Sequence, residues 1–460
     1  MTNNIHQQNY EQRLAFLHDS IESGELFRIQ RMLNSLRPGE IAHLVESSPP
    51  EQRKILWELI EQENEGEVLV ELGDEVRTAL MEDMDVNELK EAVQNLETDD
   101  MADFLRSLPN KVIHKTLASM DQQDRERVQE VLHYDEDTAG GLMDTSTLTV
   151  RPDVTVDVVL RYLRKLKELP TPLDNIYVVD KNDIFLGTLP VSTLLTSQPE
   201  ELVGDIMNKN PFTISASTPS QEVAMVFEDR DLVSCPVIDE KDHKLLGCIT
   251  IDDVVDVIRD EAEHSVMSMA GLNEEDDLFS PVPVAAKKRA VWLGTNLLTA
   301  FLAAWVIGQF ESTLNSAIAL AALMGVIPSM GGIAGSQTLT IMIRGLALGQ
   351  VTNTNARSLF TKELLIGFLN GLVWAIVVFA ISAIAFHEPS IGIVVAIAML
   401  LNLIAAPIAG VLLPLLLKKL NIDPALAGSV LLTTITDVVG YAAVLGLAAL
   451  TLPYWQKIFG

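Results

Sequence analysis

Five long apolar stretches in the C-terminal part of the chain constrain its fold more than any other feature. They cover residues 291–310, 312–348, 364–386, 391–417 and 425–450. About 20 helical residues suffice to cross a hydrocarbon core about 30 Å thick, so the sequence predicts an all-α domain of five transmembrane helices over 286–460. The second stretch contains Pro328 and Gly331-Gly332. Proline removes a backbone donor and glycine is a poor helix former, so this helix is expected to be broken or kinked there.

The charges that flank these stretches predict their orientation. Basic residues precede the first stretch and occupy two alternate connections: Lys287, Lys288, Arg289, Arg357, Lys362, Lys418 and Lys419. The opposite connections hold Glu311 and His387-Glu388, without Lys or Arg. Because basic connections stay in the cytoplasm, the N-terminus is expected inside and the C-terminus outside. The N-terminal segment MTNNIHQQNYEQR has no apolar core of a cleaved signal peptide, which agrees with that orientation.

The region before these stretches is strongly acidic. From Ala286 onward nine Lys and Arg stand against five Asp and Glu, so 24 of the 33 basic and 58 of the 63 acidic residues lie before it. Nucleic-acid binding depends on Lys and Arg that displace phosphate counterions, so this composition argues against it. An acidic surface attracts cations, although a solvated surface that aids solubility accounts for most of these carboxylates.

Residues 1–135 are expected to form an acidic helical N domain. Apolar residues recur at helical spacing, as at Ile41, Leu44 and Val45. A weak repeat relates LRPGEIAHLVESSPPEQRKILWEL, from Leu36, to LETDDMADFLRSLPNKVIHKTLASM, from Leu96. Each copy reads as two helices joined at a Pro-containing turn, so a small superhelical stack of helix pairs is predicted.

Residues 136–256 contain an α/β unit that occurs twice. The copies begin at LMDTSTLTVRPDVTVDVVL and IMNKNPFTISASTPSQEVAMVF and end at FLGTLPVSTLL and LLGCITIDDVVDVI. Met143 and Met207 lie 64 residues apart, and Gly187 and Gly247 lie 60 apart. The doubled unit resembles a tandem pair of cystathionine-β-synthase (CBS) domains, a regulatory module that often senses adenine nucleotides.

The CBS resemblance also implies a candidate nucleotide site. In such domains a Thr followed three residues later by Asp often contacts the phosphate and ribose of a nucleotide. Thr250 and Asp253 match that pattern in the second copy, whereas the first copy has Pro190 and Thr193 in those places. Only one half therefore keeps the pattern.

Asp437, in LLTTITDVVGYAAV, is the only carboxylate well inside a predicted span. A charge there costs at least about 2.5–3.5 kcal/mol, so it should face a polar cavity or a partner. One interpretation pairs it with Arg344 or with Ser and Thr on neighbouring helices. The other makes it a cation site of a pore, because Thr433, Thr434 and Thr436 place further oxygens nearby and Mg²⁺ prefers oxygen ligands. One Asp per subunit offers little for a symmetric pore, so a homodimer is predicted.

The helix that leaves the doubled unit, IDDVVDVIRDEAEHSVMSMAGL, carries carboxylates at spacings of three and four: Asp253, Asp256 and Asp260, with Glu261 and Glu263 beside them. Like charges at this spacing repel by about 0.2–0.5 kcal/mol per pair. A bound divalent cation would reverse that repulsion, so the helix becomes a candidate gate. The alternative is an ordinary solvated face.

Asp99, Asp100 and Asp103 form a third acidic group, in LETDDMADFL. Carboxylates in the first turn of a helix are expected from the helix dipole alone. The functional hypothesis is that Asp99 and Asp103 face the CBS-like pair and share cations with it.

Nearly the whole chain resembles the MgtE family of Mg²⁺ channels. The resemblance includes the order of the domains and the segments SPVPVAAKKRAVWLGTNLLTA, MGGIAGSQ and DPALAGSVLLTTITDVVG. It implies a homodimeric channel in the bacterial plasma membrane, with Asp437 in the pore, Asp423 at its cytoplasmic mouth and residues 257–285 forming a connecting plug helix and linker. It further implies closure by cytosolic Mg²⁺ and modulation by ATP. The implied regulatory Mg²⁺ ligands are Asp99, Asp103, Glu222, Asp231, Asp253, Asp256 and Glu261.

Three positions depart from the family pattern. Many members have acidic residues where this chain has His264 and Ser265, and Asn where it has Ile333. Alternatives therefore stay open: a broader divalent transporter that includes Co²⁺ or Mn²⁺, or a non-conducting CBS-containing regulatory protein. An enzyme is not expected, because the membrane part has one His, no Cys and no catalytic triad.

Overall fold

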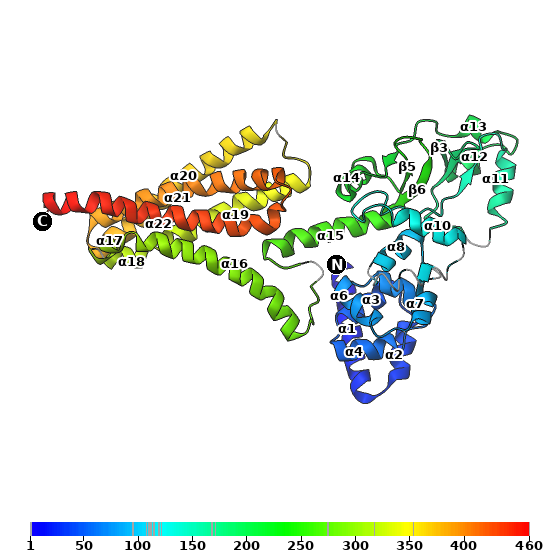
Figure 1. Cartoon of the computed structure of the whole chain (residues 1–460), viewed down its shortest axis with the longest axis horizontal. Coiled ribbons are helices and arrows are strands. Elements are labelled where there is room, and N and C mark those ends of the chain that lie inside the picture. Colours follow the sequence, from blue (N-terminus) through cyan, green and yellow to red (C-terminus); the bar gives the residue numbers. More distant parts are fainter. Residues whose placement is uncertain are drawn as a thin grey trace. The chain divides into compact units, whose positions relative to one another are not determined.

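A computed structural model describes residues 2–93, 96–106, 108, 113, 116, 117, 120, 122–166, 169, 170, 172–273, 276–316, 318–352 and 354–459. The chain forms two compact units (Figure 1). Unit 1 comprises Met1–Glu261 and Glu275–Ser280, and unit 2 comprises Ala262–Glu274 and Pro281–Gly460.

The N domain within unit 1 is built from short helices. These are α1 (Thr2–Ser23), α2 (Leu26–Leu33), α3 (Pro38–Glu46), α4 (Pro50–Trp57), α5 (Glu65–Val70), α6 (Asp74–Met81), α7 (Val86–Val93), α8 (Thr98–Arg106) and α10 (Gln122–Val131). Helices α3 and α4 both begin with proline. The N–H group of the first residue of a helix has no intrahelical partner, so proline loses no hydrogen bond there. The predicted helical N domain is confirmed. The second repeat copy, from Leu96, lies partly outside the described residues.

The remainder of unit 1 contains two three-stranded sheets of identical topology. The first copy comprises β1 (Thr149–Val150), α11 (Val156–Leu163), β2 (Asn175–Val179), β3 (Phe185–Pro190) and α12 (Val191–Thr196). The second comprises α13 (Val203–Ile206), β4 (Ile214–Ser215), α14 (Ser220–Arg230), β5 (Ser234–Ile238), β6 (Leu245–Thr250) and the first part of α15 (Ile251–Met269), whose residues from Ala262 onward belong to unit 2. In each sheet the first strand pairs parallel to the second, and the second pairs antiparallel to the third. The predicted α/β duplication is confirmed.

Two equivalent glycines allow each sheet to receive a segment from the other copy. Asp144 pairs with Cys248 beside Gly247, and Asn208 pairs with Thr188 beside Gly187. A Cβ atom added at Gly247 would lie 2.6 Å from the Asp144 carbonyl oxygen, and one at Gly187 would lie 2.2 Å from that of Asn208. Only glycine permits such close backbone approach. The two copies are thereby locked together.

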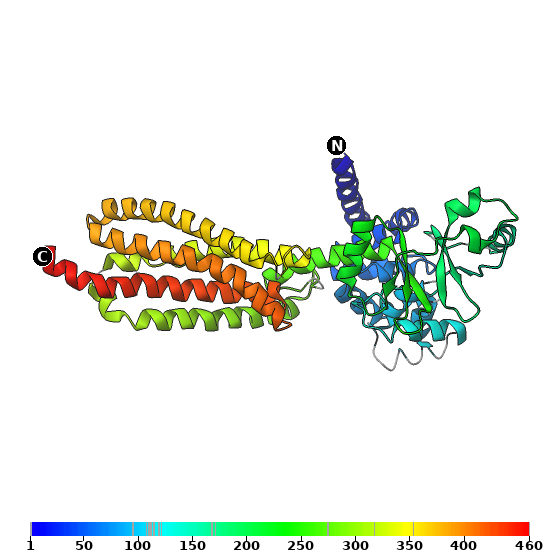
Figure 2. The same cartoon turned by 90° about the horizontal axis from the view of Figure 1, so that it is seen from above.

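Unit 2 contains five helices that are long and apolar enough to span a membrane. Its described helices are α16 (Val282–Gly308), α17 (Glu311–Ser316), α18 (Ile318–Leu323), α19 (Val326–Ala347), α20 (Ala356–Phe386), α21 (Pro389–Lys419) and α22 (Pro424–Phe459). Helices α16 and α19–α22 run side by side (Figure 2). The predicted five-helix membrane domain is confirmed.

The helical stretch over residues 312–348 is interrupted, but before the predicted position at Pro328 and Gly331-Gly332. The interruptions lie before Val326, where α17 and α18 precede α19, and Gly331-Gly332 lies inside continuous α19. Pro328 is the third residue of α19, where its missing N–H would have no intrahelical partner anyway. The proline therefore marks the start of the long helix and not a kink within it.

Glycines allow α19, α21 and α22 to pack closely. Cβ atoms added at Gly331 and Gly440 would lie 2.2 Å and 3.1 Å from Asn402 Nδ2, and the one at Gly440 would also lie 2.9 Å from Pro328. Asn402 is fully buried on α21 and donates a hydrogen bond to the Ile327 carbonyl (2.8 Å). Small residues that bring membrane helices together in this way are a main source of their association.

Gly440→Ala is expected to destabilise the membrane domain by about 1–3 kcal/mol, because the added methyl group overlaps Pro328 and Asn402. The measurement is the thermal unfolding midpoint of the purified full chain in detergent. Gly294→Ala is the matched control, because a Cβ atom there meets nothing within 4 Å. Equal midpoints for the two variants would contradict this packing.

Candidate cation sites

Asp437 lies in the interior of α22 and is half-buried. Among the described residues, no hydrogen bond or ion pair joins its carboxylate to Arg344 or to another side chain. The hydroxyl groups of Thr433 and Thr434 donate to backbone carbonyls of their own helix, at 3.0 Å and 2.7 Å. Their oxygens keep lone pairs that can face a cation. Within the described part of the membrane domain, the carboxylate therefore has no paired countercharge.

Asp423 caps the N-terminus of the same helix. Its two oxygens accept hydrogen bonds from the backbone N–H groups of Ala425 (2.8 Å) and Leu426 (3.0 Å). His264 Nε2 lies 3.3 Å from Asp423 Oδ2. His264, one of the departures from the family pattern, thus contacts the carboxylate that the resemblance places at the pore mouth.

Sequence reasoning missed Glu363. This residue lies in α20, is only 3 % exposed and accepts a hydrogen bond from Thr338 Oγ1 to its Oε2 (3.1 Å). Its Oε1 has no hydrogen-bond partner in the described part of the chain, with Lys362 Nζ 3.8 Å away. The apolar stretch was predicted to begin at residue 364, whereas α20 begins at Ala356, so the prediction left Glu363 outside the span.

The carboxylates of unit 1 gather where α8 begins. Asp99 is 5 % exposed, and its Oδ1 has no hydrogen-bond partner among the described residues. Burial and then the charge of Asp253 raise the pKa of Asp99, and the same causes raise the pKa of Asp100 to about 8. Burial and then Asp144 raise the pKa of Glu97 to about 7. We call Glu97, Asp99, Asp100, Asp144 and Asp253 the acidic junction.

Asp253 joins the acidic junction from the first turn of α15. Its Oδ2 accepts hydrogen bonds from Thr250 N (3.3 Å) and Thr250 Oγ1 (3.0 Å). Burial and then Asp252 nevertheless raise the pKa of Asp253 to about 7. Asp99 of the N domain therefore lies near Asp253 of the CBS-like pair, and the sharing of a cation between them stays a prediction. Glu97 and Asp100, which flank Asp99 in the same segment, were not among the predicted ligands, and neither was Asp144, which comes from a separate segment.

The other predicted ligands lie apart from the acidic junction or hold protein partners. Asp103 pairs with Arg106 (2.5 Å), and Asp256 pairs with Arg259 (3.1 Å). Glu261 accepts a hydrogen bond from Gln221 (2.5 Å). Glu222 lies in the first turn of α14, and Asp231 caps its C-terminus. No three His, Cys, Asp or Glu side chains in the described ranges are arranged to hold a metal ion.

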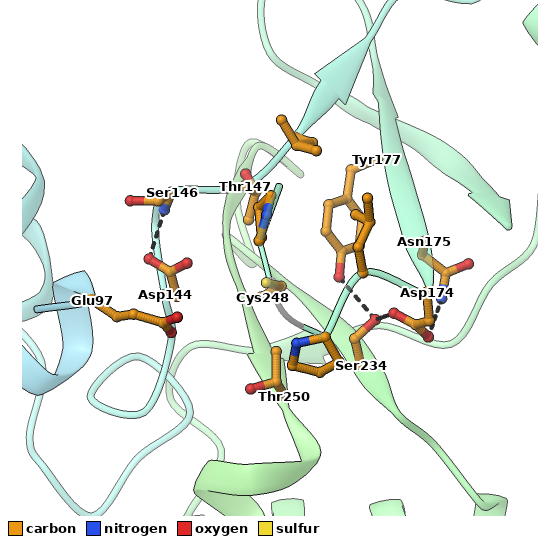
Figure 3. Close-up of a pocket in the computed structure, with 14 residues that line it drawn as sticks. Glu97, Asp144, Ser146, Thr147, Asp174, Asn175, Tyr177, Ser234, Cys248 and Thr250 are labelled. Carbon is orange, nitrogen blue, oxygen red and sulfur yellow. Dashed lines mark hydrogen bonds between the residues drawn. The ribbon is translucent and has the colours of Figure 1, made fainter. Parts of the chain in front are cut away.

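A pocket adjoins the acidic junction (Figure 3). Tyr177 donates a hydrogen bond to Ser234 (3.2 Å), and Ser234 donates one to Asp174 (2.6 Å). Glu97 and Asp144 lie in the opposite wall, near Thr250. The described part of the lining holds hydroxyl groups and three carboxylates. These carboxylates would repel a phosphate group unless a cation accompanied it.

Comparison with known proteins identifies the family. A family model described as "Divalent cation transporter" matches residues 324–447, one for the MgtE intracellular N domain matches 36–137, and one for the CBS domain matches 203–260. The magnesium transporter MgtE of Thermus thermophilus is 31 % identical over 448 residues, which cover 96 % of this chain and 99 % of that protein. The chain belongs to the MgtE family of magnesium transporters.

A second relative agrees with this assignment. The magnesium transporter MgtE of Enterococcus faecalis is 31 % identical over 71 % of this chain and 72 % of its own length. A solved structure of the cytosolic domain of the Mg²⁺ channel MgtE in complex with ATP is 29 % identical, with a TM-score of 0.49, and covers 53 % of this chain and 99 % of that one.

Membership in the MgtE family confirms several expectations. The protein is a multi-pass membrane protein of a magnesium-transporter family, and it carries a CBS module. Its relatives are transporters and not enzymes.

Stability of this MgtE-family protein should depend on pH and Mg²⁺ together. Because the pKa values of Glu97, Asp100 and Asp253 are raised to about 7, about 8 and about 7, the folded state retains protons that the unfolded state releases. This contribution to stability is complete below the ordinary carboxylate pKa, near 4, and is lost as pH rises through 7–8. Without divalent cations, the unfolding midpoint should therefore fall between about pH 6 and about pH 8.

Thermal unfolding of the full chain in detergent, with and without Mg²⁺, measures this effect. Mg²⁺ should remove most of the fall in the unfolding midpoint with rising pH, because the cation neutralises the charge of the ionised carboxylates. Asp99→Asn should reduce both the pH dependence and the Mg²⁺ effect. A midpoint that stays constant over this range without Mg²⁺ would show that the acidic junction does not control stability.

Proposed function

We propose that this protein is a homodimeric, Mg²⁺-selective uptake channel that closes when cytosolic Mg²⁺ binds among the N domain, the CBS pair and α15. The observation that carries the proposal is the acidic junction, where five carboxylates gather around the buried Asp99 and form no ion pair among the described residues. The protein lies in the bacterial plasma membrane, with its N-terminus in the cytoplasm and its C-terminus outside, as the basic connections indicate. The working division is an N domain over 1–135, a CBS pair over 136–256, a plug helix and linker over 257–285, and a membrane domain over 286–460.

The pore is assigned to α22. Asp437 supplies one carboxylate per subunit, and two-fold symmetry doubles it around an axis. Mg²⁺ gives up its water reluctantly, so a pair of carboxylates and threonine oxygens would select a hydrated ion. Asp423 lies 14 residues earlier, about 21 Å along the helix. The two aspartates are therefore successive sites along one path.

Asp437→Ala is expected to abolish Mg²⁺ uptake into proteoliposomes without lowering the thermal unfolding midpoint, because the carboxylate has no described protein partner to lose. Glu388→Ala, in a predicted outer connection, is the acidic control and should retain transport. Wild-type flux in Asp437→Ala would remove the pore assignment. Uptake of Co²⁺ or Mn²⁺ at rates equal to Mg²⁺ would favour the broader transporter, and absence of flux from the wild type would favour the regulatory protein.

The gate is assigned to α15 and the acidic junction. Carboxylate oxygens suit Mg²⁺, and Asp99 Oδ1, buried and without a described partner, is a free ligand atom. Asp99 and Asp253 would hold Mg²⁺, together with Asp103, Asp256, Glu261, Glu222 and Asp231 as the resemblance implies. Asp256 faces Glu71 of the N domain, whose pKa is raised by burial and then by the charge of Asp256. Cations bound between such groups would stabilise the form of unit 1 in which the N domain packs against α15 and the CBS pair. We call this the packed form.

Neutralising Asp253 and Asp256 together as Asn should raise the Mg²⁺ concentration that half-closes the channel by about fivefold or more, because the packed form then gains less from cations. The measurement is a series of inside-out patch recordings at increasing cytosolic Mg²⁺. Asp157→Asn, which removes an exposed pair with Arg161 on α11, is the control. An unchanged half-closing concentration in the double variant would argue against a sensor on α15.

Nucleotide binding is a second candidate function, favoured by the pocket in Figure 3. Tyr177 and Thr250 line the same pocket, and an aromatic face with nearby hydroxyl groups suits a nucleoside. Its three carboxylates require ATP to enter with Mg²⁺. Thr250 lines this pocket, whereas Asp253 lies behind it and accepts two hydrogen bonds from Thr250, so the assignment favours Thr250 as the nucleotide contact.

A further inference from the structure

The chain returns to unit 1 immediately before the first membrane helix. It leaves unit 1 at Glu261, rejoins it for Glu275–Ser280 and leaves it again at Pro281. We call Glu275–Ser280 the return segment. Pro281 is the N-cap of α16, so only one peptide bond separates the return segment from the cap of that helix.

A buried arginine of the N domain holds the return segment. Arg53 of α4 donates hydrogen bonds from Nη1 and Nη2 to the two carboxylate oxygens of Asp277, at 2.6 Å and 2.7 Å. Both side chains are only 6 % exposed. Arg53 also donates to the carbonyls of Val45 (3.1 Å) and Glu46 (2.9 Å), at the C-terminal end of α3. Because these bonds fix the guanidinium plane, the arginine presents a rigid fork to Asp277.

A second N-domain side chain binds the return segment at Asp277 and at its last residue, Ser280. Glu75 of α6 accepts a hydrogen bond from the Asp277 backbone N–H (3.1 Å) and another from the Ser280 hydroxyl group. Asp277 also accepts a bond from Phe279 N (3.0 Å), and the Phe279 ring lies 5.8 Å from the Arg53 guanidinium carbon. Residues on α4 and α6 therefore hold 277–280 through both backbone and side chain.

This ion pair differs from the many exposed charges of unit 1. Burial would raise the pKa of Asp277, but hydrogen bonds from Arg53 and Phe279 N keep it below the ordinary value. Removing one partner of a buried pair leaves an uncompensated charge in the protein interior. This lowers the stability of the folded state far more than the loss of a surface pair does. Lys54, the next residue on α4, provides the comparison: its pair with Asp83 (2.6 Å) leaves the two side chains 65 % and 61 % exposed.

We propose that Arg53, Glu75 and Asp277 form a clamp that transmits the position of the N domain directly to α16, as a second link beside α15. The inference rests on the proposed closure by cytosolic Mg²⁺. Any displacement of α4 and α6 pulls on Ser280 and hence on the start of α16. In the Mg²⁺-bound form the clamp holds α16 in its closed position.

Two variants test the clamp in inside-out patches. Asp277→Asn keeps the side-chain shape and removes the charge, whereas a Gly-Ser-Gly insertion between Ser280 and Pro281 keeps every contact and adds slack. Each should raise the half-closing Mg²⁺ concentration by about fivefold and leave the flux at low Mg²⁺ unchanged. Asp83→Asn breaks the exposed pair with Lys54, the neighbour of Arg53 on α4, and should change neither the half-closing concentration nor the flux at low Mg²⁺. Half-closing concentrations within about twofold of wild type for both variants would overturn the coupling.

A distance measurement separates failure of the clamp from failure of the proposed function. Spin labels at Glu58→Cys and Val284→Cys report on the N domain and α16, and native Cys235 and Cys248 are buried. The wild-type clamp should give one narrow distance distribution that broadens in Asp277→Asn. An unchanged distribution would overturn the clamp even if the channel closes normally. A wild-type channel whose current does not change with cytosolic Mg²⁺ would overturn the proposed closure. The distances between the spin labels would still decide whether the clamp exists.

Discussion

Apolar packing forces like charges together at the acidic junction. One buried apolar cluster runs from the N domain through Met143 to Phe227 and Val254 of the second CBS copy. It holds the start of α8 against the start of α15, and that contact brings the buried carboxylate of Asp99 near the partly buried carboxylate of Asp253. Hydrophobic burial therefore opposes charge repulsion in the same contact. A unit balanced in this way can change its packing when cations or protons relieve the repulsion.

The membrane helices and the duplicated α/β unit could be predicted because their signals are local. Twenty consecutive apolar residues, or two copies of a strand–helix pattern with equivalent glycines, need no knowledge of distant contacts. Pro328 was misinterpreted because proline has opposite meanings within a helix and in its first turn. Sequence alone could not show which turn it occupied. Ile333, a departure from the family pattern, is 55 % exposed on α19, and nothing in the structure explains that substitution.

The candidate site was only partly predictable because its members are far apart in the chain. Asp99 and Asp253 could be proposed from their acidic neighbours, but Asp144 looked like an ordinary turn residue. Arg53 and Asp277 are separated by 224 positions, and neither stands out in a chain with 63 acidic residues. Such pairs follow from tertiary packing, which periodicity and composition do not encode.

Contacts within the membrane domain place its acidic residues at successive levels. Gly335 of α19 packs against Leu432 of α22, and Leu339 packs against Gly428, so the two helices run antiparallel. Thr338 is thus level with the part of α22 between Asp423 and Asp437, and Thr338 holds Glu363. Glu363 is almost fully buried, whereas both aspartates of α22 are partly exposed. These three carboxylates are therefore of two kinds: Asp423 and Asp437 are partly exposed, whereas Glu363 of α20 is sealed between helices and hydrogen-bonded to α19.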